Sequence, residues 1–541
     1  MSVATSSLPS VRINAKRMLH KSLIFLHKWL GVALAVLLLM WFASGVVLYF
    51  VPFPVLSQVE RLAGLPALRL PPGCCLTAAQ AAGQAGLSAG EARLGMQAGL
   101  PVWRVLDGSG PDGRPQWRAL DARNGLLLPP LPVEAAAALA EAFSGQKALH
   151  TEVLERDQWT VPQGLDPYRP LVRVELDGPG GLELYVSPAA AEVVRDTRRA
   201  ERFWNWLGAV PHWIYFTELR KYPKTWHNLI VWLSISGVIL LVTGIVLGVW
   251  HLYLNRSRWI PYQKFWMRWH HISGLVAAIF TLTWMFSGLL SMNPFGVFSA
   301  RAALPAERSA WVGARAVAQL DPAAALTAAQ GLQVREIDSL QVGGQAWYRL
   351  RGEASHLLLR ADGTEDLKAM TALPDSVVHA SMQALRPGAM QLTRLDFYDD
   401  QYYAREITNN TPYTRPLPVW RAQWADGVGI YADPGSGRLL LRADTSNRWQ
   451  RILYNGLHSF DFAPLLARPR LRDTLIVLLS LLGTALCFTS CVIAWRVLFS
   501  AKRKRSSTSP DAGPKPTGLT RKSLIRQTML FTIATRLRKR G

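Results

Sequence analysis

The 541-residue sequence has few charged residues and few cysteines, and each shortage excludes a class of protein. Charged residues make up 18% of the chain and half of it is hydrophobic, which argues against intrinsic disorder. Four cysteines are too few for a disulfide-stapled scaffold, and the adjacent Cys74 and Cys75 are not expected to pair with each other. No C-x-x-C-H sequence occurs, which excludes covalent attachment of a c-type haem.

Charge is missing altogether from four long windows, residues 29–59, 225–255, 269–300 and 474–495. Because about 20 apolar residues cross a hydrocarbon core of ~30 Å, each window predicts a membrane-spanning helix. A basic lead-in precedes the first window, as in a signal peptide. That window is too long for the apolar part of a signal peptide, so we interpret it as a retained anchor.

The formal net charge of +23 would indicate a nucleic-acid binder if the protein were soluble. About 20 of these charges lie in residues 1–28, residues 252–268 and the tail from Lys502, which together contain a single acid, Asp511. By the positive-inside rule these three segments are cytoplasmic, and the nearly neutral segments between them are outside. The charge therefore predicts membrane lipids, and no nucleic acid, as a partner.

The basic tail has a pattern of its own. Ile525, Met529, Ile533 and Leu537 recur every four residues among arginines and lysines. This spacing is typical of an amphipathic helix on the anionic inner leaflet, and an unstructured positively charged tail is the alternative.

The sequence also repeats itself. Five residues recur after 243 positions: His27, Gly31, Trp41, Ser44 and Gly45 match His270, Gly274, Trp284, Ser287 and Gly288. Six recur after 246 positions: Tyr185, Pro188, Arg202, His212, Phe216 and Gly237 match Tyr431, Pro434, Arg448, His458, Phe462 and Gly483. We therefore predict two parallel pseudo-repeats, related by an axis along the membrane normal.

The predicted fold class is a membrane α-helical bundle of four transmembrane helices with two exterior α+β domains. Paired strands are expected at 102–106 and 116–120, and again at 346–350 and 356–360, with a helix at 132–143. Gly108, Gly110 and Gly113 fit G-x-G-x-x-G but lie between two predicted strands, so we interpret them as a hairpin turn. The predicted transmembrane helices are residues 23–53, 225–254, 268–293 and 471–498. The predicted cytoplasmic segments are the N-terminus (1–22), a loop (255–267) and the basic tail (499–541). Outside the membrane we predict two domains (54–200 and 294–446), each followed by a His-bearing amphipathic segment (201–224 and 447–470).

Seven of the eleven histidines lie at the predicted membrane, in two layers. His27, His251, His270 and His271 are at the cytoplasmic ends of spans, and His212, His227 and His458 are at the outer ends. Ionisable residues beside spans are functional candidates, although a single interfacial histidine can equally hydrogen-bond to lipid headgroups. The repeat favours His27 with His270 and His212 with His458 as facing pairs, and it leaves His227, His251 and His271 as competing ligands.

Two layers of paired imidazoles suit a particular cofactor. The chain lacks the cysteines and carboxylates expected beside them in a zinc site or an iron–sulfur cluster. Noncovalent b-type haem, held by two facing histidines in a helical bundle, fits better, and two haems could relay electrons across the bilayer. We expect haem b at both layers, with the iron bound through His27, His270, His212 and His458.

Four motifs resemble those of the PepSY-associated transmembrane proteins: Leu26-His-Lys-Trp-Leu-Gly, Trp226-His-Asn, Trp266-Met-Arg-Trp-His-His-Ile-Ser-Gly and Tyr454-Asn-Gly-Leu-His-Ser-Phe-Asp-Phe. That family includes inner-membrane ferric-siderophore reductases of Gram-negative bacteria. The resemblance implies PepSY-like periplasmic domains, two b-type haems, and electron flow outward to Fe(III) in a siderophore or other periplasmic iron chelate. It also implies a bacterial inner membrane location, in which the positive-inside rule leaves both termini cytoplasmic.

A further exterior segment groups hard oxygen donors that could contact a ferric chelate: Asp396, Tyr398, Asp399, Asp400, Tyr402 and Tyr403. An aromatic strand edge with solvated acids is the simpler interpretation. No flavin or nicotinamide signature occurs in the short cytoplasmic segments, so the electron donor would be a separate cytoplasmic protein or quinol. The alternatives are a non-enzymatic PepSY interaction or regulatory protein, a transporter, and a reductase of another periplasmic acceptor such as copper or a thiol.

Overall fold

The structure is a computed structural model that describes residues 9–88, 90–108, 113–254, 260–363 and 367–503. The chain divides into two units, Met1–Ile493 and Ala494–Gly541. The predicted amphipathic pattern of the tail lies outside the described residues.

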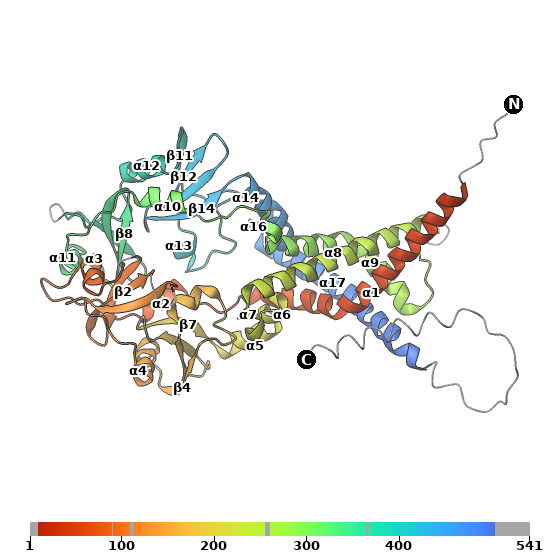
Figure 1. The fold of residues 1–541 in the computed structure, drawn as a ribbon, viewed down its shortest axis with the longest axis horizontal. Helices are drawn as coiled ribbons and strands as arrows, with labels where there is room; N and C mark the ends of the chain where they lie inside the picture. The colour runs from red at the N-terminus through yellow and green to blue at the C-terminus, as the bar shows by residue number, and fades with distance from the viewer. Residues whose placement is uncertain (1–8, 89, 109–112, 255–259, 364–366, 504–541) are drawn as a thin grey trace. The chain divides into compact units, whose positions relative to one another are not determined.

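Four long apolar helices form a bundle: α1 (Pro9–Phe50), α8 (Pro223–Leu254), α9 (Phe265–Ser291) and α17 (Pro469–Arg503). Each contains a stretch long and apolar enough to cross a membrane, which confirms the four predicted spans. Both α8 and α17 begin at a proline, whose fixed φ and missing N–H suit the first position of a helix. Figure 1 shows α1, α8 and α9 running alongside one another.

The interior of the bundle is a small apolar core. Leu34 and Leu38 of α1 pack with Leu240 of α8, Met285 of α9 and Cys487 of α17, all at most 7% exposed. The buried thiol of Cys487 therefore packs as a small apolar residue.

The remaining chain forms a sheet region with three antiparallel sheets. The largest has the strand order β10-β9-β8-β1-β2-β3, so three strands from each of the two predicted exterior domains share one sheet. β1 (Ala92–Gln97) and β8 (Glu336–Val342) are adjacent at its centre. This continuity was not predicted. It satisfies the backbone groups of two strands that would otherwise be open edges.

The hairpins of this sheet turn in the same way in both halves. Ala98 and Gly99 join β1 to β2 (Leu100–Asp107), and Gly343 and Gly344 join β8 to β9 (Gln345–Arg351). All four turn residues have positive φ, between 49° and 81°, as a two-residue type I′ turn requires.

Two four-stranded sheets complete the region. One has the order β4-β5-β6-β7 and packs against α4 (Val133–Ser144), and the other has the order β11-β12-β13-β14. Each carries a bulge between its last two strands, after Tyr185 and after Tyr431, two tyrosines that the sequence repeat matches to each other. The strands are β3 (Gln116–Asp121), β4 (Ala148–Leu154), β5 (Leu171–Leu176), β6 (Glu183–Ser187), β7 (Glu192–Thr197), β10 (His356–Arg360), β11 (Met390–Leu395), β12 (Val419–Trp424), β13 (Gly429–Asp433) and β14 (Arg438–Ala443).

Short helices connect the sheets to one another and to the bundle. They are α2 (Gln58–Gly64), α3 (Ala78–Gln84), η1 (Gln163–Tyr168), α5 (Arg199–Leu207), α6 (Ala209–Trp213), α7 (Thr217–Arg220), η2 (Pro294–Gly296), α10 (Pro305–Val312), α11 (Pro322–Ala328), α12 (Asp375–Ala384), α13 (Thr411–Thr414), α14 (Thr445–Gln450), the π-helical turn η3 (Arg451–Gly456), α15 (Leu457–Ser459) and α16 (Ala463–Leu466).

Two sequence-based expectations about this region can be checked. The predicted strand pairs occur as β2 with β3 and β9 with β10, so the glycine-rich segment after Asp107 joins two paired strands. Residues 109–112 of this segment lie outside the described residues. The expectation about the adjacent cysteines is wrong, because Cys74 and Cys75 are joined by a disulfide.

Candidate functional site

The first candidate site is a pair of histidines on two bundle helices, here called the inner pair: His27 of α1 and His270 of α9. Their ring centroids are 6.4 Å apart and their planes are inclined by 42°. The Nδ1 atom of His27 lies 3.1 Å from the carbonyl oxygen of Leu240 in α8. The Nδ1 atom of His270 lies 3.1 Å from the hydroxyl of Thr489 in α17. All four long helices thus position the inner pair.

The outer pair, His212 and His458, lies at the end of the bundle that adjoins the sheet region. His212 is in α6 and His458 is in α15, and their ring centroids are also 6.4 Å apart. The Nδ1 atom of His212 lies 3.1 Å from the carbonyl oxygen of Trp41, and that of His458 lies 3.0 Å from the hydroxyl of Ser287. Burial lowers the pKa of both histidines to about 4, so each imidazole is neutral at physiological pH.

Both pairs have the spacing that a metal ion between two imidazoles requires. A metal–nitrogen bond of about 2.0–2.1 Å on each side, with about 1.1 Å from nitrogen to ring centre, gives a centroid separation near ~6.3 Å. Because each Nδ1 atom is engaged, Nε2 is the nitrogen available for a metal. Among the described residues, none hydrogen-bonds to Nε2 of these four histidines. The described residues contain no group of three or more His, Cys, Asp or Glu side chains that could hold a metal by themselves.

Glycines and buried indole groups surround the two pairs. A Cβ atom added at Gly244 would lie 2.7 Å from Cε1 of His27, and one added at Gly45 would lie 3.1 Å from Cε1 of His212. Because glycine has no Cβ atom, these two positions avoid a close contact with the imidazole rings. The buried Nε1 atoms of Trp41 and Trp284 have no hydrogen-bond partner in the described part of the chain. These features, with the ring spacing, fit a flat macrocycle held by two imidazoles.

The two pairs form separate layers along the bundle. Ser44, whose hydroxyl lies 3.3 Å from Nδ1 of His212, is in the same helix as His27. At a rise of about 1.5 Å per residue from position 27 to position 44, the layers are about 26 Å apart along α1. This distance approaches the thickness of the hydrocarbon core.

The other three predicted histidines have different surroundings. His251 and His271 flank Tyr262, with ring centroids 5.8 Å and 5.4 Å from it, and His20 lies 5.7 Å from His251. His227 lines a surface hollow at the start of α8. The structure therefore groups His251 and His271 around a tyrosine, with the His20 imidazole as a further neighbour of His251.

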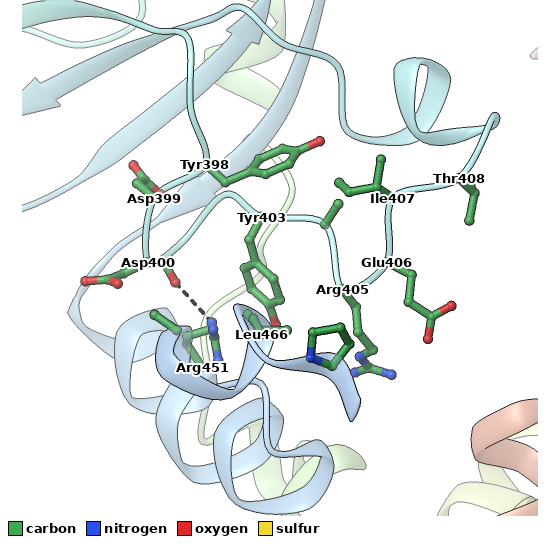
Figure 2. A pocket seen from close by; sticks show the side chains of 13 residues that line it. Tyr398, Asp399, Asp400, Tyr403, Arg405, Glu406, Ile407, Thr408, Arg451 and Leu466 are labelled. Atoms are coloured by element: carbon green, nitrogen blue, oxygen red, sulfur yellow. Dashed lines mark hydrogen bonds between the residues drawn. The ribbon is translucent and has the colours of Figure 1, made fainter. Parts of the chain in front are cut away.

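A cavity of about 670 Å³ adjoins the segment that carries His458. Figure 2 shows its two walls, the loop after β11 and the helices around Arg451 and Leu466. Four of the six predicted oxygen-donor residues line it, namely Tyr398, Asp399, Asp400 and Tyr403, together with Ala404, Arg405, Glu406, Ile407, Thr408, Arg451, Ala463, Leu466 and Pro469.

The other two predicted donors point elsewhere. Tyr402 is fully buried and its hydroxyl donates to the carbonyl of Pro416, and Asp396 is exposed beside Arg394. The carboxylate of Asp399 is also engaged, since it accepts hydrogen bonds from Arg421 and from the hydroxyl of Tyr431. Asp400, whose exposed carboxylate accepts no hydrogen bond from a described residue, is therefore the donor with the best access to a ligand.

A buried carboxylate joins this cavity to the outer pair. Asp461 is fully buried, follows His458 by three residues, and accepts hydrogen bonds from the Tyr403 hydroxyl (2.9 Å) and the Arg405 guanidinium (2.9 Å). Burial, with the negative charge of Asp461, raises the pKa of Tyr403 to about 12, so its hydroxyl remains a donor. Tyr454 continues the connection, with its ring 5.7 Å from that of His458.

Sequence reasoning missed several of these residues. Thr243 and Thr489, whose hydroxyls lie 3.4 Å and 3.1 Å from Nδ1 of His27 and His270, occupy positions that the repeat matches, so the repeat contained a signal for them. Asp461 lies within the quoted motif that begins at Tyr454, so that motif contained a signal for it. Arg405 and Arg451 had no such signal, because they meet Asp461 only when the loop after β11 folds against the segment before α17.

The fold and these sites define an integral membrane protein with four long helices, an α+β sheet region and two layers of paired histidines. One pair lies on the long helices α1 and α9, and the other lies on the short helices α6 and α15. Residues 24–497 match the PepSY-associated TM region, and the chain belongs to this family. The resemblance stated from the sequence motifs is thereby confirmed at the level of the family. No curated protein matches the chain.

Proposed function

We propose that this protein is a di-haem b oxidoreductase of the bacterial inner membrane that carries electrons outward to a ferric siderophore or a similar iron chelate. The observation that supports this function is the presence of two histidine pairs with the same 6.4 Å spacing, about one hydrocarbon thickness apart. Family membership adds support for the membrane setting.

His27 and His270 would hold one haem, and His212 and His458 the other. When bound, haem supplies one-electron chemistry at its iron. The chain contributes the ligands and their orientation, because the hydrogen-bond partners at Nδ1 fix each imidazole and leave Nε2 as the ligating atom. The apolar core around Leu34, Leu38 and Met285 excludes water between the layers.

The cavity beside the outer pair is the proposed binding site for the acceptor. Asp400 and Glu406 supply hard oxygen atoms, and Arg405 and Arg451 supply positive charge. The sheet region would then lie in the periplasm. Reduction of Fe(III) to Fe(II) weakens its hold on hard oxygen ligands, so iron would be released from the chelate. The electron donor would be a cytoplasmic protein or membrane quinol acting at the opposite end of the bundle.

An absorption spectrum tests this function directly. Protein purified after haem-replete expression should show a Soret band and about two haems per chain by the pyridine haemochrome assay. Reduction with dithionite followed by a ferric hydroxamate chelate should return the oxidised spectrum, with Fe(II) captured by a colorimetric chelator. A preparation without haem would contradict the proposal. A haem protein that no ferric chelate reoxidises would contradict the proposed acceptor and leave only the function of an electron carrier.

We expect Asp400→Asn to slow reoxidation by the ferric chelate about tenfold, because it removes a charged oxygen donor from the cavity. Stopped-flow absorbance measures the rate. Asp396→Asn is the matched control, since Asp396 belongs to the same segment but is exposed outside the cavity. Equal rates for the two variants would contradict the assignment of the cavity.

A further inference from the structure

Arg220, at the end of α7, is a buried guanidinium with no carboxylate partner among the described residues. The residue is 6% exposed and lies against two aromatic rings that contact each other, 4.7 Å from the centre of Tyr215 and 4.3 Å from that of Trp226. Its Nε atom is buried, and no described residue accepts a hydrogen bond from its side chain or forms an ion pair with it. Buried charges are normally paired, so this arrangement calls for an anion from outside the chain.

The side chain lines a hollow of about 410 Å³ whose chemistry suits an anion. The other lining residues are Gln163, Pro223, Lys224, Trp226, His227 and Asn228. No carboxylate is among these described lining residues. The nearest acid in sequence, Glu218, is exposed and pairs with Lys221 at 2.7 Å. Pro223 begins the 32-residue helix α8, so the positive end of its dipole also faces this hollow.

The corresponding point of the second half of the chain is built differently. α17 begins at Pro469, the position that the repeat matches to Pro223, and the side chain of Arg472 there is 1% exposed. Arg472 lies 3.8 Å from Asp473 and 3.7 Å from Glu406, and it also donates to the hydroxyl of Tyr49. Acidic side chains therefore lie beside the buried Arg472 at the start of α17, whereas no described acid pairs with Arg220 at the start of α8.

We propose that the Arg220 hollow binds a phosphate-type oxyanion, supplied by the headgroup of an anionic phospholipid. Arginine recognises phosphate through a planar fork of donors, and Lys224 adds a second positive charge. The hollow lies at the end of a membrane-spanning helix, with Phe216 and Tyr222 exposed beside it. Exposed aromatic residues at the ends of spans are typical of the headgroup level. A free phosphate would meet the same donors, so the test must separate the two sources.

Titration of delipidated full-length protein in detergent provides that test. The probes are dioctanoyl phosphatidylglycerol, dioctanoylglycerol, which lacks the phosphate, and inorganic phosphate, each followed by thermal shift. We expect phosphatidylglycerol to stabilise the wild-type protein and dioctanoylglycerol to have no effect. Arg220→Gln should weaken the binding of phosphatidylglycerol at least about tenfold, and Lys221→Gln, which changes a more exposed charge outside the hollow, should leave it unchanged.

Each outcome bears on the source of the anion. Stabilisation by phosphatidylglycerol alone, dependent on Arg220, supports a lipid headgroup. Equal stabilisation by inorganic phosphate, with the same dependence, would overturn the lipid assignment in favour of a soluble anion. Because Arg220→Gln removes a packed side chain, Lys224→Gln is the second variant, and we expect about threefold weaker binding from it. Equal binding by wild-type protein and both variants, or no binding of either phosphate probe, would overturn the proposal.

Discussion

The double variant His212→Ala/His458→Ala will purify with about one haem per chain in place of two. Both side chains of the outer pair are replaced, so no imidazole remains on either side of that layer. The inner pair is held by α1 and α9, about 26 Å away along α1, and keeps its hydrogen bonds to Leu240 and Thr489. The pyridine haemochrome assay, normalised to protein, measures the ratio.

A matched control and a reciprocal variant make this result specific. His379→Ala changes an exposed histidine of α12 in the sheet region and should keep two haems. His27→Ala/His270→Ala should keep the outer haem alone, with a different reduced spectrum from that of the first variant. If both double variants retain two haems, the ligands are other residues, and His227, His251 and His271 become the next candidates.

The parts of this protein that could be predicted from sequence are those determined by local pattern. The four spans follow from windows without charge, since an uncharged stretch of that length has few alternatives. The two histidine pairs follow from identities at fixed offsets, because residues matched by a repeat occupy matched positions. The bulges after Tyr185 and Tyr431 agree with the same offsets, and the hairpins at Gly99 and Gly344 repeat one turn type in the two halves.

The parts that could not be predicted depend on contacts between distant segments. β1 and β8 belong to different halves of the chain, and the sequence of either strand alone does not show whether it lies at the edge or at the centre of a sheet. The cavity beside His458 requires Tyr403 and Arg405 to meet Asp461. The burial of Arg220 could not be predicted either, because it depends on the packing of this side chain against the rings of Tyr215 and Trp226.

The largest expected loss of stability follows from Glu336→Gln. Glu336 is 1% exposed in β8 at the centre of the shared sheet, where it forms a two-point ion pair with Arg61 of α2, at 2.8 Å and 2.6 Å. Arg351 donates to the same carboxylate at 3.0 Å. Neutralising Glu336 removes this negative charge from between two buried guanidinium groups. Breaking a buried pair in this way costs about 3–5 kcal/mol.

We expect this variant to lower the melting temperature of the sheet region by roughly 10 °C, since 1 kcal/mol corresponds to about 2–4 °C for a region of this size. Scanning fluorimetry of the detergent-purified full-length protein measures the change. Asp362→Asn is the control, because the side chain of Arg360, its partner at 2.6 Å, is 59% exposed and ion pairs at the surface contribute at most about 1 kcal/mol.

The pH dependence of the same variant separates loss of charge from loss of packing. Burial alone would raise the pKa of Glu336, but the positive charges of Arg61 and Arg351 hold it well below its ordinary value of 4.5. A carboxylate whose pKa is depressed on folding stabilises the folded state above pH 4.5, and that stabilisation is lost as the pH falls further. The wild-type protein should therefore approach the Glu336→Gln variant in stability under acid conditions. A difference between the two that stays constant from neutral to acid pH would show that the carboxylate acts through packing, and the ion pair would then contribute little.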